Sequence, residues 1–145
     1  MAALDTNVLV RWLTDDDAEQ SAAVARVLQS AQEQDERLFV PVTVLLETEW
    51  VLRSRYHLDK PSVTAALDAL LSATELEFQS EPALEQALWS FKQEGSPDFA
   101  DCMHAALVNQ AGHSPLLTFD VRAARLEGAQ LLESEPQHKR QPTVG

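Results

Sequence analysis

Short apolar runs alternate with longer amphipathic stretches along the 145 residues of this chain. The longer stretches carry apolar residues at helical spacing and predict helices between successive short runs. The short runs predict strands, at residues 1–5, 38–40, 76–78, 115–119 and 129–132. Strands that alternate with helices indicate a parallel sheet with helices on both faces. We therefore expect one α/β domain over residues 1–132, with a central sheet of about five strands, and a loose tail over residues 133–145.

Local signals place the beginnings of two helices. Asp17 is a plausible N-cap, and Gln20 three residues later completes a capping-box pattern. Ser96 followed by Pro97 is typical of a helix start, because proline has no N–H to leave unpaired in the first turn. The second of these helices is expected to run from Asp98 to about residue 111.

Composition limits the classes of function. The chain has 23 acidic residues against 11 Lys and Arg, a net charge of −12, which argues against a large electrostatic footprint on nucleic acid. It does not exclude an enzyme that holds a few phosphates through metal ions. Cys102 is the single cysteine, so no intramolecular disulfide is expected. We see neither a leader pattern nor a membrane-length apolar run, and the expected location is the cytoplasm, away from membranes.

Several carboxylates occupy positions where a site residue is expected. Asp5 and Asp120 each follow a predicted strand, and α/β sheets bind ligands at that edge. Asp120 is equally well explained as the N-cap of a short helix. Asp101 lies in an apolar stripe of its helix, where a carboxylate is costly to bury without a partner. Asp98, near the beginning of the same helix, is favoured there by the helix dipole, so its functional and structural interpretations both stay open.

Glu47 and Glu49 lie on one strongly apolar helix, and periodicity alone does not choose between them. Arg53 follows Glu49 by four residues, in the orientation that favours an ion pair on a helix. Glu47 has no basic residue three or four positions away. A nearly buried Glu47 without a local partner suggests a cation supplied from elsewhere.

Carboxylates from four separate elements could therefore converge on one edge of the sheet. A cluster of carboxylates repels itself unless it is protonated or neutralised. Sites made only of oxygen ligands suit Mg²⁺ or Mn²⁺. Two such ions roughly 3.5–4 Å apart, or one ion with a general base, can activate water for phosphodiester hydrolysis.

Four motifs carry a resemblance to a known family. The strings LDTNVLVRWL, LLETEWVLRSRY, SPDFADCMHAAL and LLTFD resemble the PIN-domain family, and within it the VapC-type toxins of bacterial toxin–antitoxin pairs. The resemblance implies a PIN-like three-layer fold and Mg²⁺- or Mn²⁺-dependent endoribonuclease activity as a type II toxin. It also implies an RNA substrate and a small antitoxin whose tail occupies the active-site groove.

The resemblance also implies roles for individual residues. The catalytic and metal-binding acids would be Asp5, Glu47, Asp101 and Asp120. The supporting residues would be Thr6, Asn7 and Thr118, which match small polar positions of the family, and Asp98, which matches an acid often found beside the third one.

Other interpretations remain open at this stage. A PIN-like module that binds RNA or protein without catalysis would show the same fold. A haloacid-dehalogenase-type hydrolase needs an acid where this chain has Asn7, and a receiver domain needs a late lysine that the region after Asp101 lacks before the tail.

Arg11, Arg53 and Arg55 are candidates for phosphate contact. A homodimer is expected, with residues 43–73 as a plausible contact face.

Overall fold

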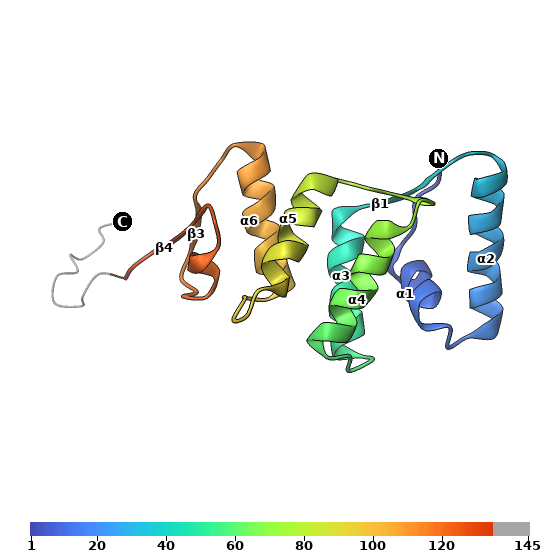
Figure 1. The fold of residues 1–145 in the computed structure, drawn as a ribbon, viewed down its shortest axis with the longest axis horizontal. Coiled ribbons are helices and arrows are strands. Elements are labelled where there is room, and N and C mark those ends of the chain that lie inside the picture. The colour runs from blue at the N-terminus through green and yellow to red at the C-terminus, as the bar shows by residue number, and fades with distance from the viewer. Residues whose placement is uncertain (135–145) are drawn as a thin grey trace, which may run out of the picture.

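A computed structural model of the chain describes residues 1–134 (Figure 1). The predicted tail at 133–145 therefore lies almost entirely outside the described residues, and the domain boundary at residue 132 stays a prediction. The helices are α1 (Thr6–Thr14), α2 (Ala18–Glu33), α3 (Val42–Ser54), α4 (Lys60–Ser72), α5 (Glu81–Lys92), α6 (Phe99–Ala111) and the short 3₁₀ helix η1 (Ala123–Arg125). The strands are β1 (Leu38–Val40), β2 (Leu76–Phe78), β3 (Leu116–Thr118) and β4 (Ala129–Leu131).

The α/β class with parallel strands is confirmed, but the strands are divided between two sheets. β1 pairs in parallel with β2, and β3 pairs in parallel with β4. The predicted first strand is reduced to a bridge between Ala3 and Phe39, which continues the β1–β2 sheet by one position. Within residues 1–134 the two sheets are not joined into the continuous sheet that the alternation of elements predicts.

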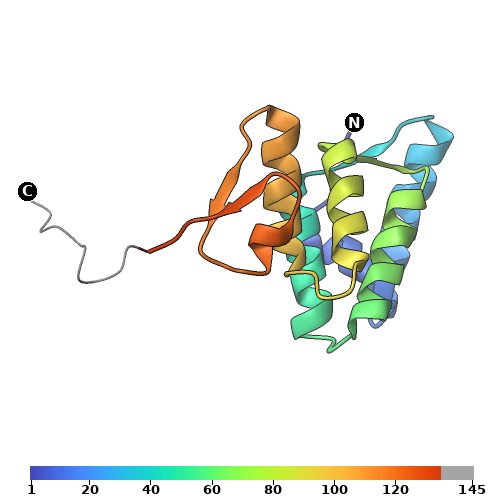
Figure 2. The same ribbon diagram turned by 60° about the vertical axis from the view of Figure 1, so that its left-hand side comes forward.

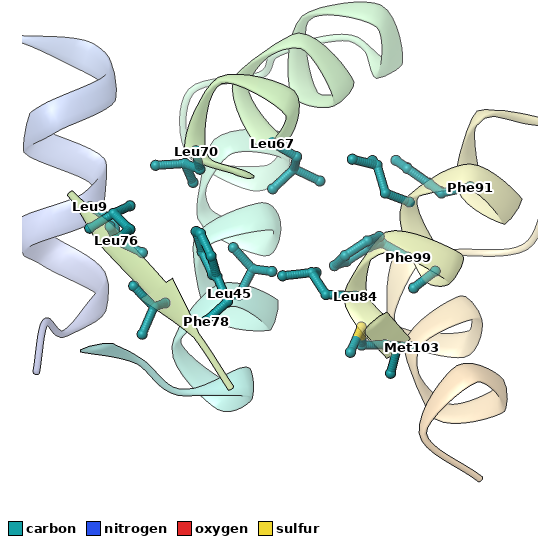
Figure 3. Packing of buried hydrophobic residues seen from close by; sticks show 14 of the residues in the cluster. Leu9, Leu45, Leu67, Leu70, Leu76, Phe78, Leu84, Phe91, Phe99 and Met103 are labelled. Carbon is teal, nitrogen blue, oxygen red and sulfur yellow. The ribbon is translucent and has the colours of Figure 1, made fainter. Parts of the chain in front are cut away.

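One apolar core joins the two halves of the chain. Leu45 and Leu67 come from α3 and α4, whereas Leu84 and Phe99 come from α5 and α6, and all four belong to the same cluster of buried side chains. Figure 3 shows these residues facing one another across the space between the helices. Burying a Leu or Phe side chain contributes roughly 1.5–3 kcal/mol, so this packing fixes where α5 and α6 sit.

Two polar contacts strengthen the same junction. Lys92 of α5 forms an ion pair with Asp68 of α4 at 2.8 Å. Just beyond the end of α5, Lys60 at the beginning of α4 donates a hydrogen bond to Ser96 Oγ at 2.7 Å. Its ammonium also lies 4.6 Å from the centroid of the Phe91 ring. The loop that leads into α6 is thereby tied to the beginning of α4.

The predicted helix starts are largely confirmed. Asp17 Oδ1 accepts a hydrogen bond from the Gln20 backbone N–H at 3.0 Å and caps α2. The Gln20 side chain instead accepts from Arg11 Nε at 2.6 Å. Helix α6 begins one residue later than predicted, at Phe99, with Asp98 in the N-cap position.

A clamp on α6 holds the β3–β4 unit in place. Asn109 Nδ2 donates to the Glu127 carbonyl at 2.9 Å, just before β4. The Ser114 hydroxyl donates to Asn109 Oδ1, just before β3. Gly128 has φ +80°, and a Cβ there would lie 1.8 Å from Asn109 Oδ1. A glycine is therefore required both by the backbone conformation and by the close approach of Asn109.

Among the described residues, no helix combines the length and the apolar character needed to cross a bilayer.

Replacing Gly128 by Ala is expected to destabilise the protein more than replacing Gly95 by Ala. Both glycines have positive φ, so both substitutions carry the strain of about 1–2 kcal/mol for a left-handed non-glycine residue. Only the Gly128→Ala side chain meets Asn109, whereas nothing lies within 4 Å of a Cβ at Gly95. Urea unfolding of both variants measures the difference, and equal losses of stability would contradict the role of the clamp.

Candidate active site

Asp5 sits at the turn between the N-terminal segment and α1. Leu4 N–H donates to the Phe39 carbonyl at 2.9 Å, which fixes the segment along β1. Asp5 then takes an extended conformation as the N-cap of α1, and its Oδ1 accepts from Val8 N–H at 3.2 Å. The residue is exposed, so its second carboxylate oxygen faces solvent. The predicted turn from strand direction into helix is present.

The expectation that Glu47 is nearly buried is wrong. Glu47 is exposed on α3, whereas Glu49 is only 2% exposed. Arg53 Nε lies 3.1 Å from Glu49 Oε1, so the predicted ion pair is present and it neutralises the buried acid. The helix turns Glu49 inward and Glu47 outward. Within the described residues no ion pair engages Glu47, and its carboxylate is available to a ligand.

The beginning of α6 presents two acids. Asp98 occupies the N-cap position but its side chain makes no capping hydrogen bond, and it is exposed. Asp101 lies in the first turn of α6, not beyond it as the predicted helix start implied, because the helix begins at Phe99. Asp101 is partly buried. The positive end of the helix dipole therefore favours both carboxylates.

Asp120 follows β3 and is held by its own loop. Its Oδ1 accepts from Arg122 N–H at 2.8 Å and from Ala123 N–H at 3.1 Å, so the predicted capping of the following turn is present. Thr118 Oγ1 accepts from Asp120 N–H at 3.0 Å, which fixes the backbone at this position.

Arg122 positions this loop against α6, and sequence reasoning missed it. Its Nε donates to the Gly95 carbonyl at 3.3 Å, and its guanidinium also donates to the Ser96 carbonyl. These bonds bring the Asp120 loop beside the beginning of α6. The only signal in the sequence was its place two residues after Asp120.

Two neighbouring acids act on Asp101. The pKa of Asp101 is raised, first by partial burial and then by the negative charge of Asp120. Asp98 raises it further, whereas His104 acts in the opposite direction. Repulsion among like charges disfavours the ionised form, and a bound cation would relieve it.

Asp5 and Glu47 lie on other elements than this group, at the beginning of α1 and on α3. Figure 1 shows α3 between α1, which begins after Asp5, and α6, which carries Asp101. The acidic charges that raise the pKa of Asp101 come from Asp120 and Asp98, not from the N-terminal half. Over residues 1–134, no three carboxylate, histidine or cysteine side chains are close enough to hold one metal ion. Their oxygen donors fit a hard divalent cation chemically.

Two of the remaining candidates, Arg11 and Arg53, have side-chain partners. Arg11 bonds Asp16 at 3.1 Å and the Tyr56 hydroxyl at 3.0 Å. Arg53 is engaged by Glu49, as described above, and Arg55 is exposed. Thr6 is buried at the beginning of α1 and Asn7 is exposed beside Asp5.

Cys102 is a packing residue. It is buried in the core, and burial raises the pKa of its thiol to about 11. Its thiol is therefore protonated at neutral pH and is a poor nucleophile.

A cavity of about 210 Å³ lies between α5 and η1. It is lined by Trp89, Ser96, Arg122 and neighbouring residues, and by none of the candidate acids.

Parallel strands alternate with helices in this structure, which makes it an α/β protein. Acids lie at strand ends and helix starts and form its candidate site. The model of the PIN domain family matches residues 2–129. The chain therefore belongs to the PIN domain family, and the resemblance found in its four motifs is confirmed.

Two known proteins illustrate the relationship. A VapC ribonuclease of Aquifex aeolicus (strain VF5) is 23% identical over 127 residues, which cover 87% of this chain and 92% of that protein. Among solved structures, VapC20 of Mycobacterium tuberculosis, described as a sarcin-ricin loop cleaving toxin, matches at 18% identity and a TM-score of 0.38. That match covers 85% of this chain and 92% of the other.

Replacing Asp120 by Asn is expected to lower the pKa of Asp101, because it removes the nearest like charge while keeping a polar side chain of the same shape. The pKa should stay above the ordinary aspartate value, since burial is the larger cause. Replacing His104 by Ala should raise the pKa of Asp101. Carboxyl carbon shifts followed by NMR during a pH titration measure both, and an unchanged value in Asp120→Asn would contradict the proximity of the two acids.

Proposed function

We propose that this protein is a metal-dependent endoribonuclease that acts as the toxin of a type II toxin–antitoxin pair. The observation that carries the proposal is the alignment with a VapC ribonuclease, which extends over 87% of this chain and 92% of the relative, together with membership of the PIN domain family. The acidic positions of the four motifs are all occupied by Asp or Glu. An intact acid set supports catalysis over a purely binding role.

The site residues are proposed as Asp5, Glu47, Asp101 and Asp120, with Mg²⁺ or Mn²⁺ as cofactor. A divalent cation bound by these carboxylates would supply activation of water and stabilisation of the departing oxygen of the phosphodiester. Carboxylates with no sulfur or imidazole ligand among the four favour hard cations over zinc. Thr118 fixes the backbone of Asp120, and Asp98 leaves an uncapped carboxylate beside Asp101. Thr6 and Asn7 are proposed to support Asp5.

The partners follow from the same proposal. RNA is the substrate, and a small antitoxin protein is the inhibitor. A net charge of −12 suits a partner with a basic segment, because complementary charge speeds association and selects the partner. We place the activity in the cytoplasm, and we assign it to residues 1–132, with 133–145 as a tail.

Purified protein is expected to cleave RNA in the presence of Mg²⁺ or Mn²⁺ and to lose this activity in EDTA. Asp5→Ala and Asp101→Asn should each lower the rate by roughly 100-fold or more, since even outer residues of metal sites contribute about 10–100-fold. Glu85→Gln, an exposed acid on α5, is the matched control and should keep the wild-type rate. Gel analysis of labelled RNA measures cleavage.

Cleavage that survives EDTA, or that is unchanged in Asp5→Ala, would overturn the mechanism. Mg²⁺ binding without turnover of any RNA would instead favour the non-catalytic PIN-like module. That alternative is supported by one observation, namely that a single chain does not bring the four acids together within its described part.

Activity is also expected to fall on addition of the product of a short neighbouring reading frame. Such a product should have a DNA-binding N-terminus and an amphipathic tail, and it should co-purify with this chain. Co-expression with a tagged neighbour, followed by the RNA assay, measures both effects. A neighbour that binds without inhibiting cleavage, or the absence of any such reading frame, would leave a stand-alone nuclease.

A further inference from the structure

The cavity between α5 and η1 lies beside two of the proposed site residues. Figure 2 shows η1, in orange-red, next to the loop that joins α5 to α6. Ser96 and Pro97 of that loop line the cavity, and Asp98 follows them directly. Arg122 lines the opposite wall, and its backbone N–H donates to Asp120 Oδ1 at 2.8 Å. A polymer bound at Asp98 and Asp120 therefore has this cavity within reach of its neighbouring units.

An exposed tryptophan forms another wall of the cavity. Trp89 lines it from α5 and is 66% exposed. Most of a large apolar ring therefore stays in water, and a flat ligand that stacks on the indole would remove that surface from solvent.

Charged side chains also line the cavity without partners of opposite charge. Glu94 lies in the loop after α5, and Arg125 and Glu127 lie in and after η1. Within residues 1–134, none of these three takes part in an ion pair. Arg122 instead donates to the carbonyls of Gly95 and Ser96, so it fixes the wall. A hollow with a few unpaired polar groups is typical of a ligand site.

The size and the polar groups of the cavity select a small planar ligand. Its volume of about 210 Å³ is below the roughly 300–1,000 Å³ of sites for drug-sized molecules, so it suits a single ring system. The amides of Gln86 and Gln93 offer donors and acceptors, and the carboxylates of Glu94 and Glu127 offer acceptors. Unpaired RNA bases have two stacking faces and a polar edge, and proteins bind them by stacking and by hydrogen bonds to that edge.

The charge of the protein gives such a subsite a purpose. A net charge of −12 leaves this chain without the extended basic surface that holds RNA by its phosphates. Stacking of a base on an aromatic ring needs no positive charge from the protein. An aromatic subsite therefore supplies affinity that the overall charge does not provide.

We propose that this cavity binds one unpaired base of the RNA substrate, next to the cleaved bond, with the base stacked on Trp89 and its phosphate at Arg125. The proposal rests on the proposed endoribonuclease activity for the identity of the polymer. Glu94 and Glu127 accept hydrogen bonds from an amino group, so a base with an exocyclic amine is preferred over uracil. A basic segment of a protein partner fits less well, because Arg122 and Arg125 would repel it.

Cytidine monophosphate (CMP) and uridine monophosphate (UMP) test the subsite without cleavage, because neither contains a phosphodiester bond. Each is added to wild-type protein in EDTA, so that no metal at the acids can hold the phosphate. The indole N–H signal of Trp89, identified by its loss in Trp89→Phe, is followed by NMR. CMP should shift this signal and bind about 10-fold more tightly than UMP, since uracil presents a carbonyl oxygen where cytosine presents its amino group.

The variant Glu94→Gln/Glu127→Gln should remove the preference for CMP, because amides also donate to a carbonyl oxygen. Equal affinities of wild-type protein for the two nucleotides, or a Trp89 signal that neither of them shifts, would overturn the proposal. So would a Trp89 signal that responds only to a lysine-rich peptide, because the cavity would then belong to a protein partner.

Trp89→Ala should raise the dissociation constant of CMP about 10-fold, which corresponds to about 1.4 kcal/mol and lies within the range of base stacking on aromatic side chains. The backbone amide of Gly95, which also lines the cavity, reports binding in this variant. Trp89→Phe keeps an aromatic ring and should recover most of the affinity. Circular dichroism checks the fold, and an unchanged affinity in Trp89→Ala would refute stacking.

Arg125→Ala should raise the dissociation constant of CMP about 10-fold and leave that of cytidine, which has no phosphate, unchanged. Arg26→Ala is the matched control, because Arg26 is an exposed arginine on α2 outside the cavity. A loss of affinity that is equal for CMP and cytidine would contradict a phosphate contact at Arg125.

Cleavage of RNA separates this proposal from the proposed function. Trp89→Ala should raise KM about 10-fold with little change in kcat, because the base is held equally in the ground and transition states. If CMP binds at Trp89 but no RNA is cleaved, the base subsite stands and the nuclease proposal falls. If RNA is cleaved and Trp89→Ala changes neither KM nor CMP binding, the nuclease proposal stands and the subsite falls.

Discussion

The packing of α5 and α6 against α3 and α4 decides the rest of this structure. Leu84 and Phe99 share one core with Leu45 and Leu67, so the C-terminal half is fixed beside the N-terminal helices. This packing leaves the two short sheets separate. Each sheet is held in place by the helices beside it.

Electrostatic repulsion acts among the carboxylates near the beginning of α6. Burial is the first cause of the raised pKa of Asp101, and the negative charges of Asp120 and Asp98 add to it. Adding Asp5 and Glu47 to that group would increase the repulsion, so an assembled site is stable only with positive charge at its centre.

Local features of the sequence predicted much of this structure. Asp17 caps α2, Asp5 turns the chain into α1, and Glu49 pairs with Arg53, because each feature depends on residues only a few positions apart. The exposure of Glu47 was not predicted, since a helix that is apolar almost all round does not reveal which side faces the core. The separation of the sheets was not predicted either. Which strands pair depends on contacts between distant segments, which alternation along the chain does not specify.

The clamp formed by Asn109 has a consequence for motion. Two side chains, Asn109 and Arg122, hold the segment from Ser114 to Glu127 on α6. This segment contains β3, η1 and Asp120 and contributes only Ala123 to the fully buried set. It can therefore open as a cooperative local unit while the helices stay folded, and its amide protons would exchange with solvent sooner than those of the core. Asp120, which follows β3, is thus carried on a segment with little buried surface of its own.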